Sequence, residues 1–193
     1  MNKKAVLRFG LLISLILTSH SFGEIQVLMK LDGITLPKTF SSKSELPAFT
    51  DGYITIQGAS SGYAVSGTDS GAGSRTAGRA DFSEFSIFKP ADEITPILTL
   101  HGVQGSVLNK VIVVWVEVTD AQARPAKLME FTLENVRVSG GAISGSEGDQ
   151  SGTESTTFVW EKMTMQSFIR DDKGGVTDGP KVVIDATNNT ASS

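Results

Sequence analysis

The chain has 193 residues, of which 39% are hydrophobic and 20% are charged, a composition typical of one globular domain with a real core. It contains no cysteine, which excludes disulfides and thiolate metal sites in any compartment. The formal net charge is −4 and no cluster of lysine and arginine is present, so nucleic acid and anionic membrane surfaces are poor candidate partners.

Residues 1–23 have the layout of a secretory signal peptide. A basic beginning is followed by an apolar run over residues 11–17 and by small residues that end at Gly23. The apolar run is too short for a permanent membrane-spanning helix, and a lipoprotein signal requires a cysteine, which the chain lacks. We therefore expect cleavage after Gly23.

The mature chain is expected to begin with a strand, because apolar residues alternate over residues 25–31. Residues 32–51 follow as a long connection with prolines and serines, and loops of this length are usually functional or mobile. A second strand is expected over residues 53–56. The glycine- and serine-rich stretch at residues 58–78 indicates a flexible or turn-rich segment.

A third strand is expected over residues 82–88, and the only good helix candidate follows at residues 92–102. Thr95 can cap this helix, Pro96 suits its first position and Gly102 can end it.

Beyond the helix the pattern is again that of strands. Residues 111–118 are almost wholly apolar and β-branched, which is typical of a buried central strand. Later the apolar parity changes near Glu134–Asn135 and again at Glu161–Lys162, which predicts a β-bulge at the first place and a matching slip at the second. Residues 140–152 should form a loose hairpin connection between the two strands.

Matched kinks in two long strands predict a strongly coiled sheet. The expected fold class is all-β with one short helix, built as a small β-barrel or a tight two-sheet sandwich. A last short strand is expected over residues 181–184, ahead of a polar tail at residues 187–193 that we expect to be disordered. The sequence shows no internal repeat and predicts a single domain over residues 24–186.

Candidate catalytic residues are few. The mature chain holds one histidine, His101, and a lone imidazole at a helix end more often interacts with exposed carbonyls than acts as a base. Ser60 lies in a G-x-S-x-G match, but a nucleophile elbow requires a helix after the serine and here a glycine-serine stretch follows. A hydrolase that uses Ser60 and His101 is the least favoured function, because we expect the two residues to lie far apart.

Asp171, Asp172 and Asp178 could crowd around a calcium ion, but the EF-hand spacing with its terminal glutamate is missing and a solvated turn explains them better. Residues 188–190 form a glycosylation triplet, which matters only in a host that glycosylates. We therefore assign no catalytic, cofactor-binding or metal-binding residue and expect no enzymatic activity.

Six features occur in a fixed order along the chain. They are a glycine-rich loop, a strand of alternating aromatics, an acidic residue with Thr-Pro that starts the helix, a strand of the form T-L-x-N-V-x-V-S, a glycine-serine loop and a strand with an aromatic core. In order, these are residues 67–78, residues 82–89, Asp92 with residues 95–98, residues 132–139, residues 145–149 and residues 153–160. By their order and spacing the chain resembles the haemolysin-coregulated protein (Hcp) family over most of residues 25–170.

The resemblance implies a small β-barrel of two sheets with one flanking helix. It also implies subunits that form hexameric rings, which stack into the inner tube of a type VI secretion system and can hold effector proteins in the lumen. Residues 32–51 correspond in position to the extended loop that reaches a neighbouring ring.

The leader predicts a secreted or periplasmic protein with no membrane segment in its mature form. The alternative function is an exported binding module or effector on the same scaffold, not built into a tube, with the glycine-rich loops as its recognition surface.

Overall fold

The computed structural model describes residues 23–70, 74–118, 125–149, 151–171 and 175–193. The predicted signal peptide lies outside the described residues, except for Gly23 at its end. In chain order the elements are β1 (Glu24–Asp32), β2 (Tyr53–Ile56), β3 (Gly58–Ser60), β4 (Tyr63–Ser70), β5 (Ser74–Phe82), β6 (Phe85–Pro90), α1 (Thr95–Gln104), β7 (Val107–Val118), β8 (Ala126–Ser144), β9 (Thr153–Val159), β10 (Lys162–Arg170), β11 (Val176–Asp185) and β12 (Thr190–Ser192). The predicted fold class, all-β with one short helix, is confirmed.

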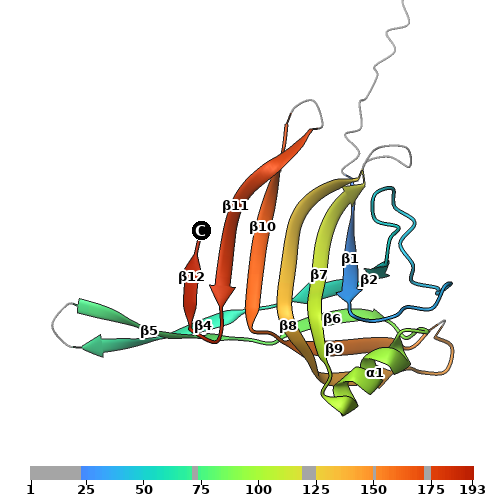
Figure 1. The fold of residues 1–193 in the computed structure, drawn as a ribbon, viewed down its shortest axis with the longest axis horizontal. Coiled ribbons are helices and arrows are strands. Elements are labelled where there is room, and N and C mark those ends of the chain that lie inside the picture. Colours follow the sequence, from blue (N-terminus) through green and yellow to red (C-terminus); the bar gives the residue numbers. More distant parts are fainter. Residues whose placement is uncertain (1–22, 71–73, 119–124, 150, 172–174) are drawn as a thin grey trace, which may run out of the picture.

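The strands form two layers that share one strand (Figure 1). The first layer has the order β12-β11-β10-β8-β7-β1-β2, and the second contains β3, β6 and β9. The long strand β8 belongs to both, because its first half pairs with β10 and its second half pairs with β9. Among the described strands no ladder joins β2 to β6, so the arrangement is the two-sheet alternative and not a closed barrel.

The change of layer occurs at Asn135, where the backbone of β8 takes a left-handed conformation with φ 53°. Leu133 and Val136, on either side of it, are both wholly buried although their parity differs. The predicted change of face at residues 134–135 is therefore correct.

The predicted β-bulge is nevertheless wrong in form. Val111 pairs with Leu133 and Leu108 with Val136, so β7 and β8 keep one register through the bend and no residue is inserted. Both strands change face together, because both must follow the fold from one layer into the other.

The predicted slip at residues 161–162 lies at the same corner. Strand β9 ends and β10 begins there. The N–H of Glu161 donates to the carbonyl of Glu134 at 3.1 Å, and the side-chain amide of Asn135 donates to Glu161 Oε2 at 2.8 Å. The two irregularities that the sequence indicated are thus one structural corner.

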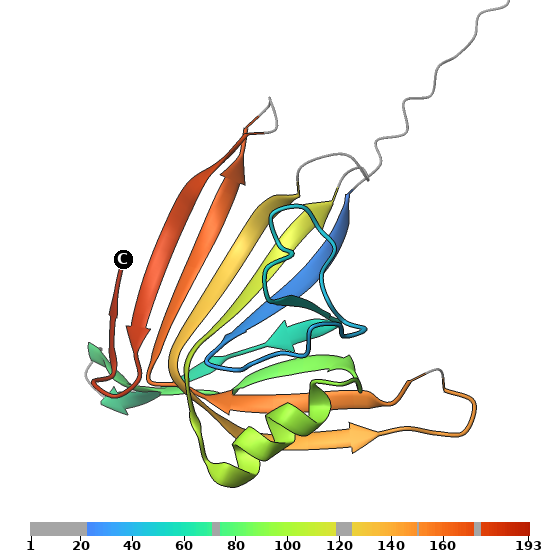
Figure 2. The ribbon, with the colours of Figure 1, turned by 45° about the vertical axis from the view of Figure 1, so that its right-hand side comes forward.

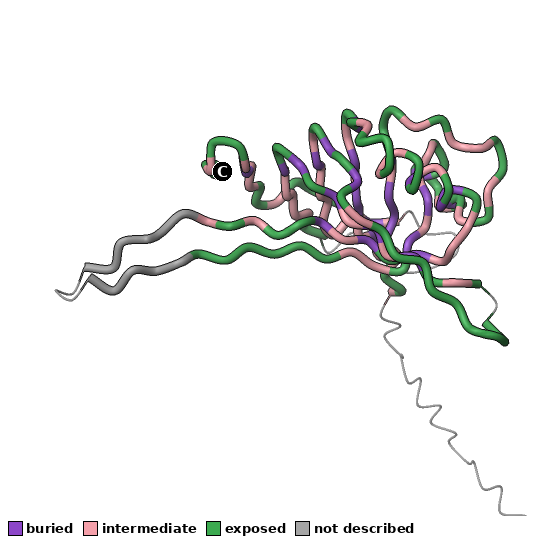
Figure 3. Tube along the Cα trace, turned by 90° about the horizontal axis from the view of Figure 1, so that it is seen from below, coloured by how far each residue is buried: buried purple, intermediate pink, exposed green. Residues whose placement is uncertain are grey.

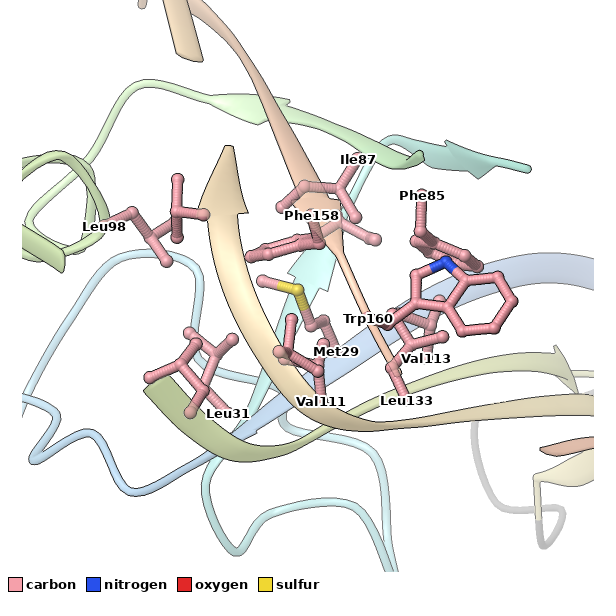
Figure 4. Packing of buried hydrophobic residues seen from close by; sticks show 14 of the residues in the cluster. Met29, Leu31, Phe85, Ile87, Leu98, Val111, Val113, Leu133, Phe158 and Trp160 are labelled. Atoms are coloured by element: carbon pink, nitrogen blue, oxygen red, sulfur yellow. The ribbon is translucent and has the colours of Figure 1, made fainter. Parts of the chain in front are cut away.

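The main hydrophobic core lies between the two layers (Figure 4). The period-2 residues of β1, β7, β8 and β9 point into it, as expected for strands with one buried face. Its wholly buried members are Met29, Phe85, Ile87, Ile94, Leu108, Val111, Val113, Leu133, Val136 and Phe158.

A second, smaller cluster lies on the opposite face of β1 and β7. Leu28, Val114 and Val116 are covered there by Phe49, whose ring meets that of Tyr53 edge-on at 5.2 Å between centroids. The loop over residues 33–52 thus folds back over the sheet. That this loop reaches a neighbouring ring, as the resemblance implies, stays a prediction.

The segment that projects is the hairpin of β4 and β5 (Figures 1 and 3). These strands pair with each other over residues 63–82 and form a separate two-stranded sheet. The stretch at residues 58–78, predicted to be flexible or turn-rich, contains β3, β4 and the first part of β5. An antiparallel ladder uses backbone groups, which glycine and serine supply as well as any residue. The predicted strand at residues 82–88 is divided between β5 and β6.

The helix begins at Thr95, one residue before the predicted first position at Pro96, and packs against β8 (Figure 2). The prediction that Thr95 caps the helix was wrong, because Ile94 is the N-cap residue and no side chain caps the helix there. Asp92 Oδ1 accepts the N–H of Ile94 at 2.9 Å, and the N–H of Asp92 donates to Thr95 Oγ1 at 3.0 Å. Gly105, with φ 63°, ends the helix in place of Gly102. Gly102 instead allows close packing, since a Cβ there would lie 3.1 Å from a methyl carbon of Val138.

The C-terminal region is more ordered than predicted. Strand β11 starts at Val176, well before the expected strand at residues 181–184. The tail at residues 187–193, predicted to be disordered, contains β12, which pairs with Val183–Asp185. The turn between them is fixed by Asn188, whose backbone and side-chain nitrogens both donate to Asp185 at 2.8 Å.

Phe158→Ala should reduce the free energy of unfolding by about 3–5 kcal/mol, because it leaves a cavity where the two layers meet. The matched control is Val159→Ala on the same strand, where the side chain is 41% exposed and the expected loss is below about 1 kcal/mol. Urea denaturation measures both variants, and equal losses would contradict the two-layer core.

Candidate functional site

One buried ion cluster, made of Lys89, Asp92 and Glu154, lies where the helix meets the second layer. The Lys89 side chain is wholly buried, and its Nζ lies 2.5 Å from Asp92 Oδ1 and 2.8 Å from Glu154 Oε2. It also donates to the carbonyl oxygen of Pro90 at 3.0 Å. Two carboxylates therefore share one ammonium group.

Hydroxyl groups complete the cluster. Thr95 Oγ1 donates to Glu154 Oε2, Thr156 Oγ1 donates to Glu154 Oε1 at 2.7 Å, and Ser42 Oγ donates to Asp92 Oδ2 at 2.5 Å. The cluster thereby ties together loop 33–52, β6, the start of α1 and β9. A buried charge is tolerated only when it is paired in this way.

The pKa of Asp92 is set by opposing effects. Burial alone would raise it, but hydrogen bonds from Lys89, Ser42 and the N–H of Ile94 outweigh burial and lower the pKa below its usual value. Because Lys89 is wholly buried, its ammonium group holds these segments together from within the interior.

The two residues considered for hydrolysis are not brought together. Ser60 is exposed at the end of β3 and is followed by β4, so the helix that a nucleophile elbow requires is missing at this point. His101 lies on α1, where its Nδ1 is buried without a hydrogen-bond partner. Among the described residues no hydrogen bond links the two.

The residues considered for calcium close a turn. The N–H of Gly175 donates to Asp171 Oδ1 at 2.6 Å, while Asp178 is paired with Phe168 in the ladder of β10 and β11. Asp172 lies outside the described residues. Within the described part of the chain, no three histidine or acidic residues are grouped to hold a metal ion.

Sequence reasoning missed an apolar trough at the root of the projecting hairpin. Its volume is about 500 Å³, and its lining includes the rings of Trp115 and Phe131, whose centroids lie 5.0 Å apart and whose planes are tilted by 58°. The lining residues are Ala59, Ser60, Ser61, Gly62, Tyr63, Phe82, Phe85, Trp115, Phe131, Met163, Met165 and Ile184.

The apolar trough and the hairpin are adjoining surfaces that suit contact with another protein. Tyr63, where the hairpin leaves the body, is 71% exposed, and large exposed aromatics are frequent in interfaces. In the sequence, Met163 and Met165 alternate with polar residues, which indicated that both face inward. This pattern could not indicate that the second layer leaves part of the inward face uncovered.

The described helix, ten residues long, does not have the length that a bilayer crossing requires.

Most of the chain matches the model of one protein family. A family model described as "Type VI secretion system effector, Hcp" matches residues 29–166. No match was found among curated proteins.

Three solved structures share the fold. One is described as a type six secretion system protein, with a TM-score of 0.73, 18% identity, and coverage of 88% of this chain and 100% of that one. Hcp1 from Salmonella typhimurium has a TM-score of 0.63 and 16% identity, and the match covers 86% of this chain and 98% of that one. A type VI secretion system effector from Yersinia pestis has a TM-score of 0.54 and 19% identity, and the match covers 83% of this chain and 99% of that one.

Lys89→Met should reduce the free energy of unfolding by about 3–5 kcal/mol, because it leaves two carboxylates buried without a cation. Lys30→Met is the matched control, since its partner Asp51 is fully exposed and such pairs contribute at most about 1 kcal/mol. Thermal and urea unfolding give the two values, and a Lys89 variant as stable as the control would disprove the structural role of the cluster.

Stability should also fall in acid through Asp92. A carboxyl whose pKa is lower in the folded state stabilises the protein above its unfolded pKa, and the contribution is lost as the pH drops through the folded value. Asp92→Asn should therefore cost stability at pH 6, and this cost should decrease steadily as the pH falls below about 4. Urea midpoints across this range test the prediction, and curves that stay parallel down to pH 3 would refute it.

Proposed function

This chain belongs to the Hcp family of type VI secretion proteins, and we propose that it is a structural, ring-forming component of a secretion tube that carries effector proteins. Subunits would close into hexameric rings that can stack. The proposed activity is assembly, with no reaction catalysed.

The observation that carries the proposal is the projecting hairpin. Strands β4 and β5 form a two-stranded sheet of their own, and an isolated two-stranded ribbon is at best marginally stable in water. Contact with a neighbouring copy would stabilise it, either through its unpaired backbone edges or through the neighbour's apolar trough. Contacts between unlike surfaces of identical subunits generate closed rings when the rotation permits.

The placement of ionisable groups supports assembly over catalysis. An enzyme needs titratable groups gathered in an accessible pocket, whereas the lysine and two carboxylates that gather here are buried and paired. The apolar trough contains no ionisable acid or base among its lining residues apart from the phenol of Tyr63.

Export of the mature chain to the periplasm or the medium is part of the proposal. The first ladder begins at Glu24, which pairs with Val118, so cleavage after Gly23 would leave every strand intact. We propose one domain that begins at Glu24 and includes β12. The negative net charge argues against nucleic acid as a partner.

The mature protein is expected to run as a hexamer in size-exclusion chromatography with light scattering. Replacing residues 66–79 by a two-residue Asn-Gly turn between the paired Val65 and Ala80 should weaken association by about tenfold or more without unfolding the body. A strict monomer at high concentration would contradict the tube role and favour the alternative, an exported binding module on the same scaffold.

A further inference from the structure

A second surface hollow lies between α1 and the end of β8, away from the apolar trough. This helix groove has a volume of about 330 Å³, at the lower end of the range of roughly 300–1,000 Å³ for binding pockets. Leu98 and Val103 of the helix form one side, and Ala142 and Ile143 of β8 form the other. Its walls are therefore largely apolar.

The helix groove is open at the surface. Val103 is 82% exposed and Ile143 is 59% exposed, so two apolar side chains flank the opening. An opening of this kind suits a chain segment with apolar residues on either side of the one that enters.

The base of the helix groove carries a charge. Glu154 lines it together with Thr156, and no other lining side chain is ionisable. Glu154 belongs to the buried ion cluster, in which two carboxylates share the single ammonium group of Lys89. With both carboxylates ionised the base is therefore electrically negative.

The two oxygens of Glu154 are occupied unequally. Oε2 accepts from both Lys89 and Thr95, whereas Oε1 accepts from Thr156 at 2.7 Å. A carboxylate oxygen has two lone pairs, so Oε1 can accept one further donor. One free acceptor site suits the compact ammonium of a lysine better than the planar fork of an arginine, which needs two.

We propose that the helix groove is a docking site for a lysine-containing segment of a partner protein, whose aliphatic stem lies along the apolar walls and whose ammonium reaches Glu154. Lysine stems bury well on apolar surfaces while the charged end finds a polar partner. Added positive charge also balances the cluster. This docking site is separate from the hairpin and the apolar trough, so it does not depend on ring formation.

The test uses two peptides and methyl NMR, which remains feasible for a large ring. The probes are acetyl-Leu-Lys-Leu-amide and the same peptide with norleucine, which lacks only the charged amine. The lysine peptide should shift the methyl signals of Leu98, Val103 and Ile143 and bind about tenfold tighter or more than the norleucine peptide. Unchanged Leu28 and Leu108 signals report an intact fold.

Three variants complete the experiment. Glu154→Gln keeps the shape and leaves Lys89 paired with Asp92, so it should bind both peptides about equally. Ala142→Phe fills the helix groove and should abolish binding, whereas Ala64→Phe, at an exposed alanine of β4 outside the groove, should not.

Equal affinity of the wild-type protein for the two peptides, shifts confined to other methyl groups, or no saturable shift would each overturn the proposal. Light scattering on the same samples reports the oligomeric state, so failure of ring formation and failure of lysine docking are observed separately.

Discussion

The requirement that β8 pair in both layers determines the rest of the fold. Because its first half belongs with β10 and its second half with β9, the strand must change direction, and Asn135 does so with a left-handed backbone. β7 bends with it and keeps its register with β8 through the bend, and β9 ends and β10 begins at the same corner. The core fills the angle between the layers, and α1 packs on the second half of β8.

The buried ion cluster holds the body of the molecule together, whereas the projecting hairpin extends away from the body. The cluster joins loop 33–52, β6, α1 and β9 with charges that cannot separate without being left unpaired in the interior. The backbone ladder of the hairpin, by contrast, joins β4 only to β5 over the described residues. The proposed assembly through the hairpin and the adjoining apolar trough would therefore require no rearrangement of the body.

The parts of this fold that could be predicted from the sequence have a buried side-chain pattern. The alternation over residues 25–31, the β-branched run before Val118 and the change of parity near Asn135 each indicated the structure found. The hairpin could not be found in this way, because its pairing rests on backbone groups. The ion cluster was equally hidden, since Lys89, Asp92 and Glu154 become neighbours only after β6, α1 and β9 have come together.

The most direct test of the account is electron cryomicroscopy of the assembled mature protein. The account predicts closed six-fold rings in which residues 63–82 of each copy lie against a neighbouring copy. Isolated subunits, or rings in which this hairpin extends into solvent without touching another chain, would contradict it.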